Sequence, residues 1–292
     1  MAPPRSRYPS KLDASSIEYA REQFKETPKK RQEYLKKLRQ HFNDHEKPEF
    51  NITTEDEVLL AFLRSSKYNL PIAIDKLKNY YRMRSEMPSV FSDRDPRTQR
   101  IQEVLRLGTF VPLRKLQNGR LVLIVRVSVF DPSQYTLLEI FKVAYMILDV
   151  CNKICPQMHV HGVCAIFDLA GMSFAHARLT TPSIIKHMVK SWENYHCRPK
   201  QLEFINAPMF INVLLNVFRS FMKKKMKDRL RVHSGGNDSL LEILDPSVLP
   251  IEYGGEDGSI QEHATFWCDE ITKHADWFLF DEQFKQTKII NT

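Results

Sequence analysis

Eleven lysine and arginine side chains gather between residues 186 and 231. The same window holds three acids, Glu193, Glu203 and Asp228, so its formal charge is +8. The whole chain of 292 residues also carries +8, from 43 basic and 35 acidic residues, which leaves the remainder neutral. A solvated face normally mixes both signs, whereas a field of one sign attracts polyanions. The window therefore predicts a binding site for an anionic partner.

The surrounding residues favour an anionic lipid over a nucleic acid. The apolar residues that precede the lysines of this window are Met209, Phe210, Val213, Leu214, Val217, Phe218 and Phe221. We predict one helix over 208–230, on which Lys225 and Arg229 share a face because they are four residues apart. An apolar half followed by a basic half suits a helix at a membrane interface, although core packing alone also explains the apolar half. Nucleic-acid binders interleave exposed aromatic and basic residues or carry a recognisable motif, so we expect no nucleic-acid partner.

Signatures of catalysis and of cofactor binding are missing from the sequence. No GxSxG, HExxH or kinase-like set occurs, and nine glycines offer no phosphate-binding loop, so we expect no enzyme and no cofactor. Asp168 has no partner base or nucleophile nearby in sequence, and we interpret it as a cap of the turn after a strand. Cys155, His159, His161 and Cys164 are residue types that bind zinc, but their spacing is not standard. We place both histidines in a solvent-facing loop and predict no metal site.

Cysteine usage and hydropathy indicate the compartment. Five cysteines form no disulfide framework, residues 1–13 lack the apolar core of a signal peptide, and no apolar run approaches the roughly 20 residues of a membrane span. We therefore expect a cytoplasmic monomer whose contact with membranes is peripheral and transient.

The elements that must position these residues fall into two parts. Over residues 1–95 we predict a helical domain with a loose N-terminal arm over 1–15. Over residues 96–292 we predict an α/β domain with a helical tail. Asn118-Gly119 between two apolar runs predicts a hairpin. Helices over Leu137–Ile154 and 182–195 then alternate with strands over 163–167 and 202–205. This alternation is typical of a mainly parallel sheet covered by helices.

Several segments in a fixed order carry a family resemblance. They are residues 60–64 (LAFLR) and 78–81 (KNYY), 165–171 (AIFDLAG) and 174–176 (FAH), 204–208 (FINAP), and 249–255 (LPIEYGG). On these segments the chain resembles the CRAL-TRIO family, in the branch of α-tocopherol transfer protein and cellular retinaldehyde-binding protein. The likeness covers about residues 50–285.

The resemblance implies a cytosolic protein that carries one lipophilic molecule in an apolar pocket under a mobile gate helix and exchanges it at membranes. It implies no covalent chemistry. A basic cleft beside the gate would bind phosphatidylinositol bisphosphates. The positions that match the cleft of the tocopherol branch are Arg198, Lys200, Lys225 and Arg229, and all four fall inside the basic window.

We predict that the pocket is lined by Phe141, Ala144, Leu148, Val163, Met188, Val189, Leu202, Phe210, Leu214 and Val217. Ala144 and Leu148 stand where the tocopherol protein has small hydroxyl residues, which predicts a drier pocket and a more uniformly apolar ligand. The sequence does not choose among tocopherols, retinoids, carotenoids and similar lipids. Two other functions stay open: a phosphoinositide-reading sensor or adaptor without transfer activity, and an esterase-like lipid enzyme, which the missing nucleophile motif disfavours.

Overall fold

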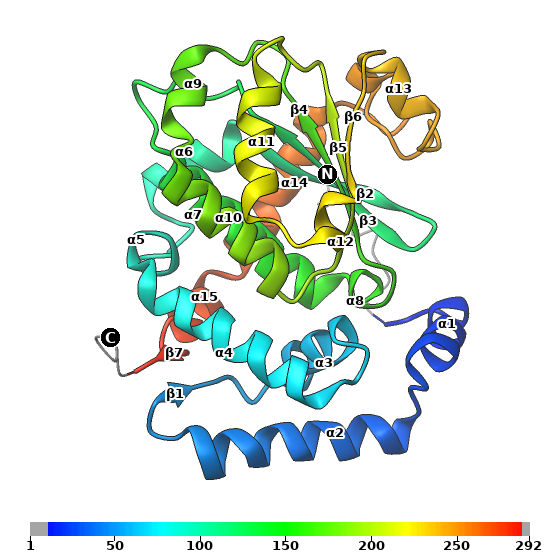
Figure 1. The fold of residues 1–292 in the computed structure, drawn as a ribbon, viewed down its shortest axis with the longest axis vertical. Coiled ribbons are helices and arrows are strands. Elements are labelled where there is room, and N and C mark those ends of the chain that lie inside the picture. The colour runs from blue at the N-terminus through cyan, green and yellow to red at the C-terminus, as the bar shows by residue number, and fades with distance from the viewer. Residues whose placement is uncertain (1–10, 288–292) are drawn as a thin grey trace.

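Figure 1 shows the computed structural model of the chain, which describes residues 11–287. Most of the expected loose arm over 1–15 lies outside the described residues. The first helix begins at Ala14, and the side chain of Asp13 caps it by accepting a hydrogen bond from the backbone of Ser16 at 2.7 Å.

The first part of the chain folds into helices that lie together at one end of the molecule (Figure 1). These helices are α1 (Ala14–Phe24), α2 (Pro28–His41), α3 (Asp56–Ser65), α4 (Leu70–Glu86) and α5 (Pro88–Phe91), with a helical turn over Phe42–Glu46. The side chains of Thr27 and Asn69 cap α2 and α4, and a proline stands in the first turn of each. A two-residue strand, β1 (Phe50–Asn51), interrupts this otherwise helical region.

A five-stranded sheet forms the centre of the second part. Its strands are β2 (Phe110–Gln117), β3 (Arg120–Arg126), β4 (Val163–Asp168), β5 (Pro199–Ile205) and β6 (Leu230–Val232), hydrogen-bonded in that order. Only β2 and β3 are antiparallel, joined by the predicted turn at Asn118-Gly119, where both residues have positive φ. The other three pairs are parallel, so the prediction of a mainly parallel sheet is confirmed.

Each parallel connection passes through helices, as the geometry of parallel strands requires. The helices of the second part are α6 (Gln99–Arg106), α7 (Leu137–Ile154), α8 (Gln157–His161), α9 (Phe174–Leu179), α10 (Pro182–Asn194), α11 (Ile211–Phe221), α12 (Lys224–Lys227), α13 (Asp238–Leu241), the turn η2 (Ile251–Tyr253), α14 (Ile260–Lys273) and α15 (Ala275–Asp281). Thr136 and Glu139 form a capping box at the start of α7. Helices α10 and α11 pack side by side (Figure 1).

The single helix predicted over 208–230 is wrong. Helix α11 ends at Phe221, Met222 and Lys223 have extended backbone angles, α12 is one short turn, and β6 begins at Leu230. Glu193 on α10 accepts the backbone N–H of Lys223 at 3.2 Å, so this amide bonds to α10 instead of continuing the helix. Lys225 and Arg229 therefore do not share a face of one helix.

The end of the described chain returns to its beginning. Strand β7 (Lys285–Gln286) pairs with β1 as a small antiparallel sheet, and the backbone N–H of Thr287 donates to the carbonyl of Glu49 at 2.7 Å. Trp277 on α15 donates its indole N–H to Glu55 at 3.1 Å. The two parts of the chain are thus joined at the far end from the hairpin.

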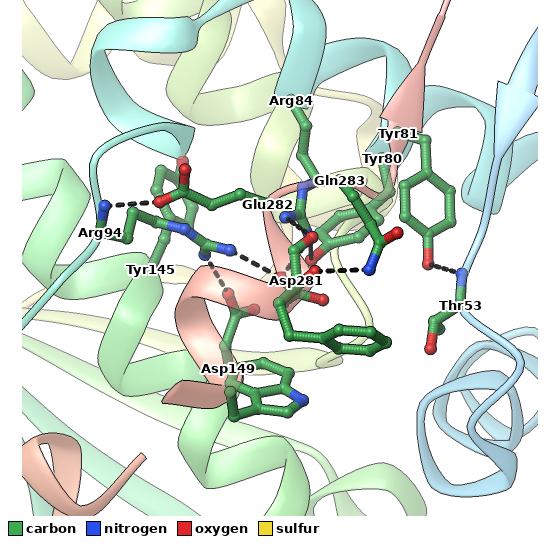
Figure 2. Close-up of polar contacts among 12 residues, drawn as sticks. Thr53, Tyr80, Tyr81, Arg84, Arg94, Tyr145, Asp149, Asp281, Glu282 and Gln283 are labelled. Carbon is green, nitrogen blue, oxygen red and sulfur yellow. Dashed lines mark hydrogen bonds and ion pairs between the residues drawn. The ribbon is translucent and has the colours of Figure 1, made fainter. Parts of the chain in front are cut away.

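A buried ion network also connects the two parts (Figure 2). Arg84 on α4 and Arg94 after α5 both contact the carboxylate of Asp281, at 2.7 and 2.6 Å, and Arg94 also contacts Asp149 on α7 at 2.8 Å. The phenol of Tyr195 donates to Asp149. Burial alone would lower the pKa of Arg84, but the neighbouring negative charges outweigh it and raise that pKa.

Candidate functional site

A cleft of about 310 Å³ lies where α10, the segment before β5, and α12 meet the turn between α3 and α4. We call it the basic cleft. Its lining residues are Ser65, Ser66, Lys67, Ile72, Lys76, Trp192, Glu193, Cys197, Arg198, Pro199, Lys223, Lys225, Met226 and Arg229. Six of these are basic, and Glu193 is the single acid among them.

Three of the four predicted headgroup residues, Arg198, Lys225 and Arg229, line this cleft together. Lys200 does not line it. The Lys200 side chain runs along Gly162, where an added Cβ would lie 2.6 Å from its Cγ. The charges of the cleft still affect its ammonium group. Burial, followed by the charges of Arg198 and Arg229, lowers the pKa of Lys200 to about 8.

The basic groups of the cleft repel one another. Burial, and to a smaller extent the charges of Arg198 and Lys223, lower the pKa of Lys76 to about 8. The charge of Arg229, followed by burial, lowers the pKa of Lys225, and burial lowers the pKa of Arg229 itself. An anion placed in the cleft would offset both the cost of burying these cationic groups and their repulsion of one another.

Glu193 partly neutralises the cleft from within. Its carboxylate contacts the ammonium of Lys223 at 3.0 Å, and the Glu193 side chain is 15% exposed against 80% for Lys223. Together with the bond to the Lys223 backbone, this contact fixes the end of α11 to α10.

Lys67 and Lys76 are the cleft residues that the charge window missed. Lys67 adopts a left-handed conformation, with φ of 52°, in the turn between α3 and α4, and Lys76 lies in the middle of α4. Both lie outside the charge window, in the remainder of the chain, whose formal charge sums to zero. A local charge count has no means of finding them, because only the tertiary fold brings α4 against α10.

Two apolar cavities lie next to the basic cleft, between the sheet and the helices that cover it. The first cavity, of about 110 Å³, is lined from α7, α10 and strands β3, β4 and β5, and the second, of about 100 Å³, extends beneath α11. The residues that line both cavities are Thr109, Val125, Ile140, Phe141, Phe167, Met188 and Trp192. The residues that line both the first cavity and the basic cleft are Trp192, Cys197 and Pro199. Trp192 thus borders all three spaces, and its ring stacks on Phe218 of α11 with centroids 5.7 Å apart.

The predicted pocket residues divide into two groups. Those that line a cavity are Phe141, Ala144, Leu148, Val163, Met188, Leu202 and Leu214. Val189, Phe210 and Val217 line neither of the two cavities. Val189 is buried elsewhere on α10, and Phe210 stacks against Phe174 of α9 with centroids 4.6 Å apart.

Hydroxyl residues also line these otherwise apolar cavities, and the sequence prediction did not name them. Tyr145, Ser191 and Tyr195 line the first cavity, Thr180 lines the second, and Thr109 lines both. Tyr145 donates to Ser191, Ser191 donates to the carbonyl of Met188 at 2.8 Å, and Tyr195 donates to Asp149. Tyr145 follows Ala144 directly in the sequence. The prediction considered only Ala144 and Leu148, the positions where the tocopherol protein has small hydroxyl residues, and therefore missed Tyr145.

An exposed apolar face lies on the outer side of α11 and on α9. Met209 is fully exposed, Val213 is 73% exposed and Phe174 is 67% exposed. The opposite side of α11, with Ile211, Leu215 and Phe218, is buried over the second cavity. Helix α11 is therefore amphipathic: its buried side is apolar, and its exposed side carries Val213 among the polar residues Asn212, Asn216 and Ser220.

The predictions for two polar residues outside the cleft, Asp168 and His159, had different outcomes. Asp168 caps the turn after β4, as expected, since it accepts from the backbone of Ala170 at 3.0 Å, and it also contacts Asn206 and Tyr253 at 2.8 Å each. The placement of His159 in a solvent-facing loop is wrong, because α8 forms there and buries this side chain. Within residues 11–287, no group of three or more His, Cys, Asp or Glu side chains is arranged to hold a metal ion.

No helix within residues 11–287 is both long and apolar enough to cross a bilayer.

Comparisons with known proteins agree with this architecture. Residues 106–255 match the CRAL/TRIO domain, and residues 27–101 match the Pinta-like UBA domain. Rat (Rattus norvegicus) clavesin-2 is 28% identical over 206 residues, which is 70% of this chain and 63% of clavesin-2. The mouse (Mus musculus) protein named alpha-tocopherol transfer protein-like is 28% identical over 255 residues, 87% of this chain and 73% of that protein.

Rat clavesin-1 is 26% identical over 246 residues, 84% of this chain and 69% of that protein. The chain thus spans somewhat less than two thirds of the length of clavesin-2. The match to the CRAL/TRIO domain alone covers more than half of the residues. The chain belongs to the CRAL/TRIO domain family.

Proposed function

We propose that the protein carries one lipophilic molecule in the two apolar cavities and exchanges it at membranes that contain phosphoinositides. The observation that carries this proposal is the wall of Trp192, Cys197 and Pro199, which belongs both to the first cavity and to the basic cleft. A site for anionic headgroups and a site for apolar cargo are therefore in direct contact. The name of the mouse relative, which refers to transfer of α-tocopherol, supports cargo of this class.

In this proposal, helix α11 is the gate. Its buried side closes the second cavity, while Val213 on its outer side and Met209 in the turn before it are already exposed to solvent. At a membrane, the apolar side that α11 buries over the cavity finds apolar surroundings when the helix swings outward, as does the exposed Val213. Each 100 Å² of apolar surface that would otherwise meet water is worth about 2.5 kcal/mol, so the bilayer compensates for the opening.

Phosphate groups would be held by the basic residues of the cleft through charge-assisted hydrogen bonds. Arg198 and Arg229 have restricted side chains, because they donate to the backbone carbonyls of Val160 and Pro199. Lys225 and Lys67 are exposed and free to move toward a headgroup. The proposed function needs neither a cofactor nor covalent chemistry, and the protein would associate with the membrane surface peripherally and transiently.

The test is transfer of a fluorescent lipophile from the loaded protein to vesicles with and without phosphatidylinositol 4,5-bisphosphate. The double variant Lys225→Glu with Arg229→Glu should lose the phosphoinositide-dependent part of the rate and still load the lipophile. Lys29→Glu with Lys36→Glu, two exposed positions on α2, makes the same charge change away from the cleft and serves as control. Equal phosphoinositide-dependent rates for the two double variants would refute the proposal.

A second function, a phosphoinositide-reading sensor or adaptor without transfer, is favoured by one observation. The basic cleft, at about 310 Å³, is larger than either apolar cavity. Such a protein would bind headgroups tightly and contain no stoichiometric lipophile. Organic extraction of the purified protein followed by mass spectrometry separates the two functions.

A further inference from the structure

Thr109 differs from every other hydroxyl residue in the cavity walls. It lies in the bend before β2, its side chain is 95% buried, and its backbone carbonyl is already used by the N–H of Arg126 at 2.7 Å. Its hydroxyl oxygen is buried and has no hydrogen-bond partner among the described residues. The hydroxyls of Tyr145, Ser191, Tyr195 and Thr180 all have one.

A buried hydroxyl without a partner is costly, and folded proteins seldom keep one in an apolar wall. Valine has nearly the same shape as threonine and would fill this position without that cost. Thr109 also lines both cavities, so a ligand atom beside this residue has apolar space on two sides. Val125, Ile140 and Phe141, which also line both cavities, have no polar side-chain atom.

We propose that Thr109 is the polar recognition point for the cargo, which is a lipophile with one hydrogen-bonding oxygen set between two apolar portions. A secondary alcohol, a ketone or an ether-flanked hydroxyl belongs to this class, and a pure hydrocarbon does not. The proposal rests on the proposed function, because it assumes that the two cavities hold cargo. It replaces the expectation of a uniformly apolar ligand with a defined place for one oxygen atom.

The experiment compares two probes of one skeleton, pentadecan-8-ol and pentadecane. The full-length protein is equilibrated with an equal mixture, free lipid is removed by gel filtration, and the bound lipid is extracted and quantified. Thr109→Val should lower the bound alcohol-to-alkane ratio about fivefold relative to the natural protein, which is the effect of one hydrogen bond of ordinary strength. The difference in water solubility of the probes cancels, because the same mixture is used for both proteins.

Two further variants distinguish a recognition role from a structural one. Thr109→Ser keeps the hydroxyl and should keep the preference for the alcohol, whereas Thr265→Val makes the same chemical change on the exposed side of α14 and should leave the ratio unaltered. In the empty protein, Thr109→Val should melt at the same or a higher temperature, because it removes a hydroxyl that has no partner.

The outcomes separate the two proposals. If the natural protein retains both probes and Thr109→Val leaves their ratio unchanged, the role of Thr109 is refuted while lipophile binding stands. If the natural protein retains neither this pair of probes nor any lipophile on extraction, the proposed function fails and the role of Thr109 fails with it. A ratio that falls in Thr109→Val and is preserved in Thr109→Ser supports the assignment.

Discussion

Two groups of buried or half-buried basic side chains in this protein have opposite electrostatic surroundings. In the ion network of Figure 2, Arg84 and Arg94 share the carboxylates of Asp281 and Asp149, and the pKa of each arginine is raised even though burial opposes the charge. In the basic cleft, the pKa values of Arg198, Arg229 and Lys76 are all lowered, and so is that of Lys200 beside it.

The direction of the pKa shift separates the roles of the two groups. A cation whose pKa is raised already has its anion inside the protein, and its task is to hold elements together. A cation whose pKa is lowered lacks enough negative charge nearby, so an anion from outside would stabilise it. Counting basic residues in the sequence cannot make this distinction, because both groups contribute equally to net charge.

The largest effect is expected from breaking the network at its shared carboxylate. Asp281→Asn removes the charge that faces both Arg84 and Arg94, leaves the buried Arg84 without its carboxylate and Arg94 with Asp149 alone, and should lower the free energy of unfolding by about 3–5 kcal/mol. Urea denaturation measures the loss. Asp276→Asn, which removes an exposed partner of Arg97, is the matched control and should cost less than about 1 kcal/mol. Similar losses in the two variants would mean that the buried network is no more stabilising than a surface pair.

An intermediate effect is expected from titrating the cleft. Lys76 and Lys200 have a pKa of about 8 in the free protein, so both are charged below pH 8 and lose their charge above it. A phosphate monoester is doubly charged across this range. The affinity for soluble inositol 1,4,5-trisphosphate, measured by calorimetry at constant ionic strength, should therefore fall about tenfold between pH 7 and pH 9.5.

Lys76→Met sharpens the same experiment. It should weaken binding at pH 7 and flatten the pH profile, because one of the two titrating groups is gone, while Lys29→Met on the exposed side of α2 should reproduce the profile of the natural protein. An affinity that stays constant up to pH 9.5 in the natural protein would show that these lysines do not face the ligand.

The smallest effect is expected from the acid inside the cleft. Glu193→Gln keeps an acceptor for the backbone of Lys223 but removes the charge that pairs with its ammonium. Because Lys223 is largely exposed, the free energy of unfolding should change by less than about 1 kcal/mol. Headgroup affinity should rise about two- to fivefold in the same calorimetric titration, since the added phosphate no longer competes with an internal carboxylate. A lower affinity would mean that Glu193 instead helps to shape the cleft.

Local patterns in the sequence predicted much of the architecture. Asn118-Gly119 specified the hairpin, and the alternation of apolar strands with amphipathic helices specified the mainly parallel sheet. The charge window brought forward Arg198, Lys225 and Arg229, which do lie in one cleft. These features depend on residues close together in the chain, which is why periodicity and composition reveal them.

Features that depend on distant partners were not predictable in this way. The break after α11 depends on Glu193, thirty residues earlier, and Lys67 and Lys76 enter the cleft from another helix pair. The burial of His159 depends on the packing of α8 against α3. The unpaired hydroxyl of Thr109 is likewise invisible in the sequence, because a threonine before a strand usually finds a local partner.

The closure of the chain by β7 and Asp281 has a consequence for biosynthesis. Arg94 and Asp281 are 187 residues apart, and Asn51 meets the carbonyl of Gln283 across 232 residues. At a synthesis rate of roughly 5–20 residues per second, α4 waits about ten seconds or more on the ribosome before the carboxylate that neutralises Arg84 exists. During that interval the early helices lack both the carboxylate and the strand that join them to the second part, so this junction forms only after α15 and β7 have been synthesised.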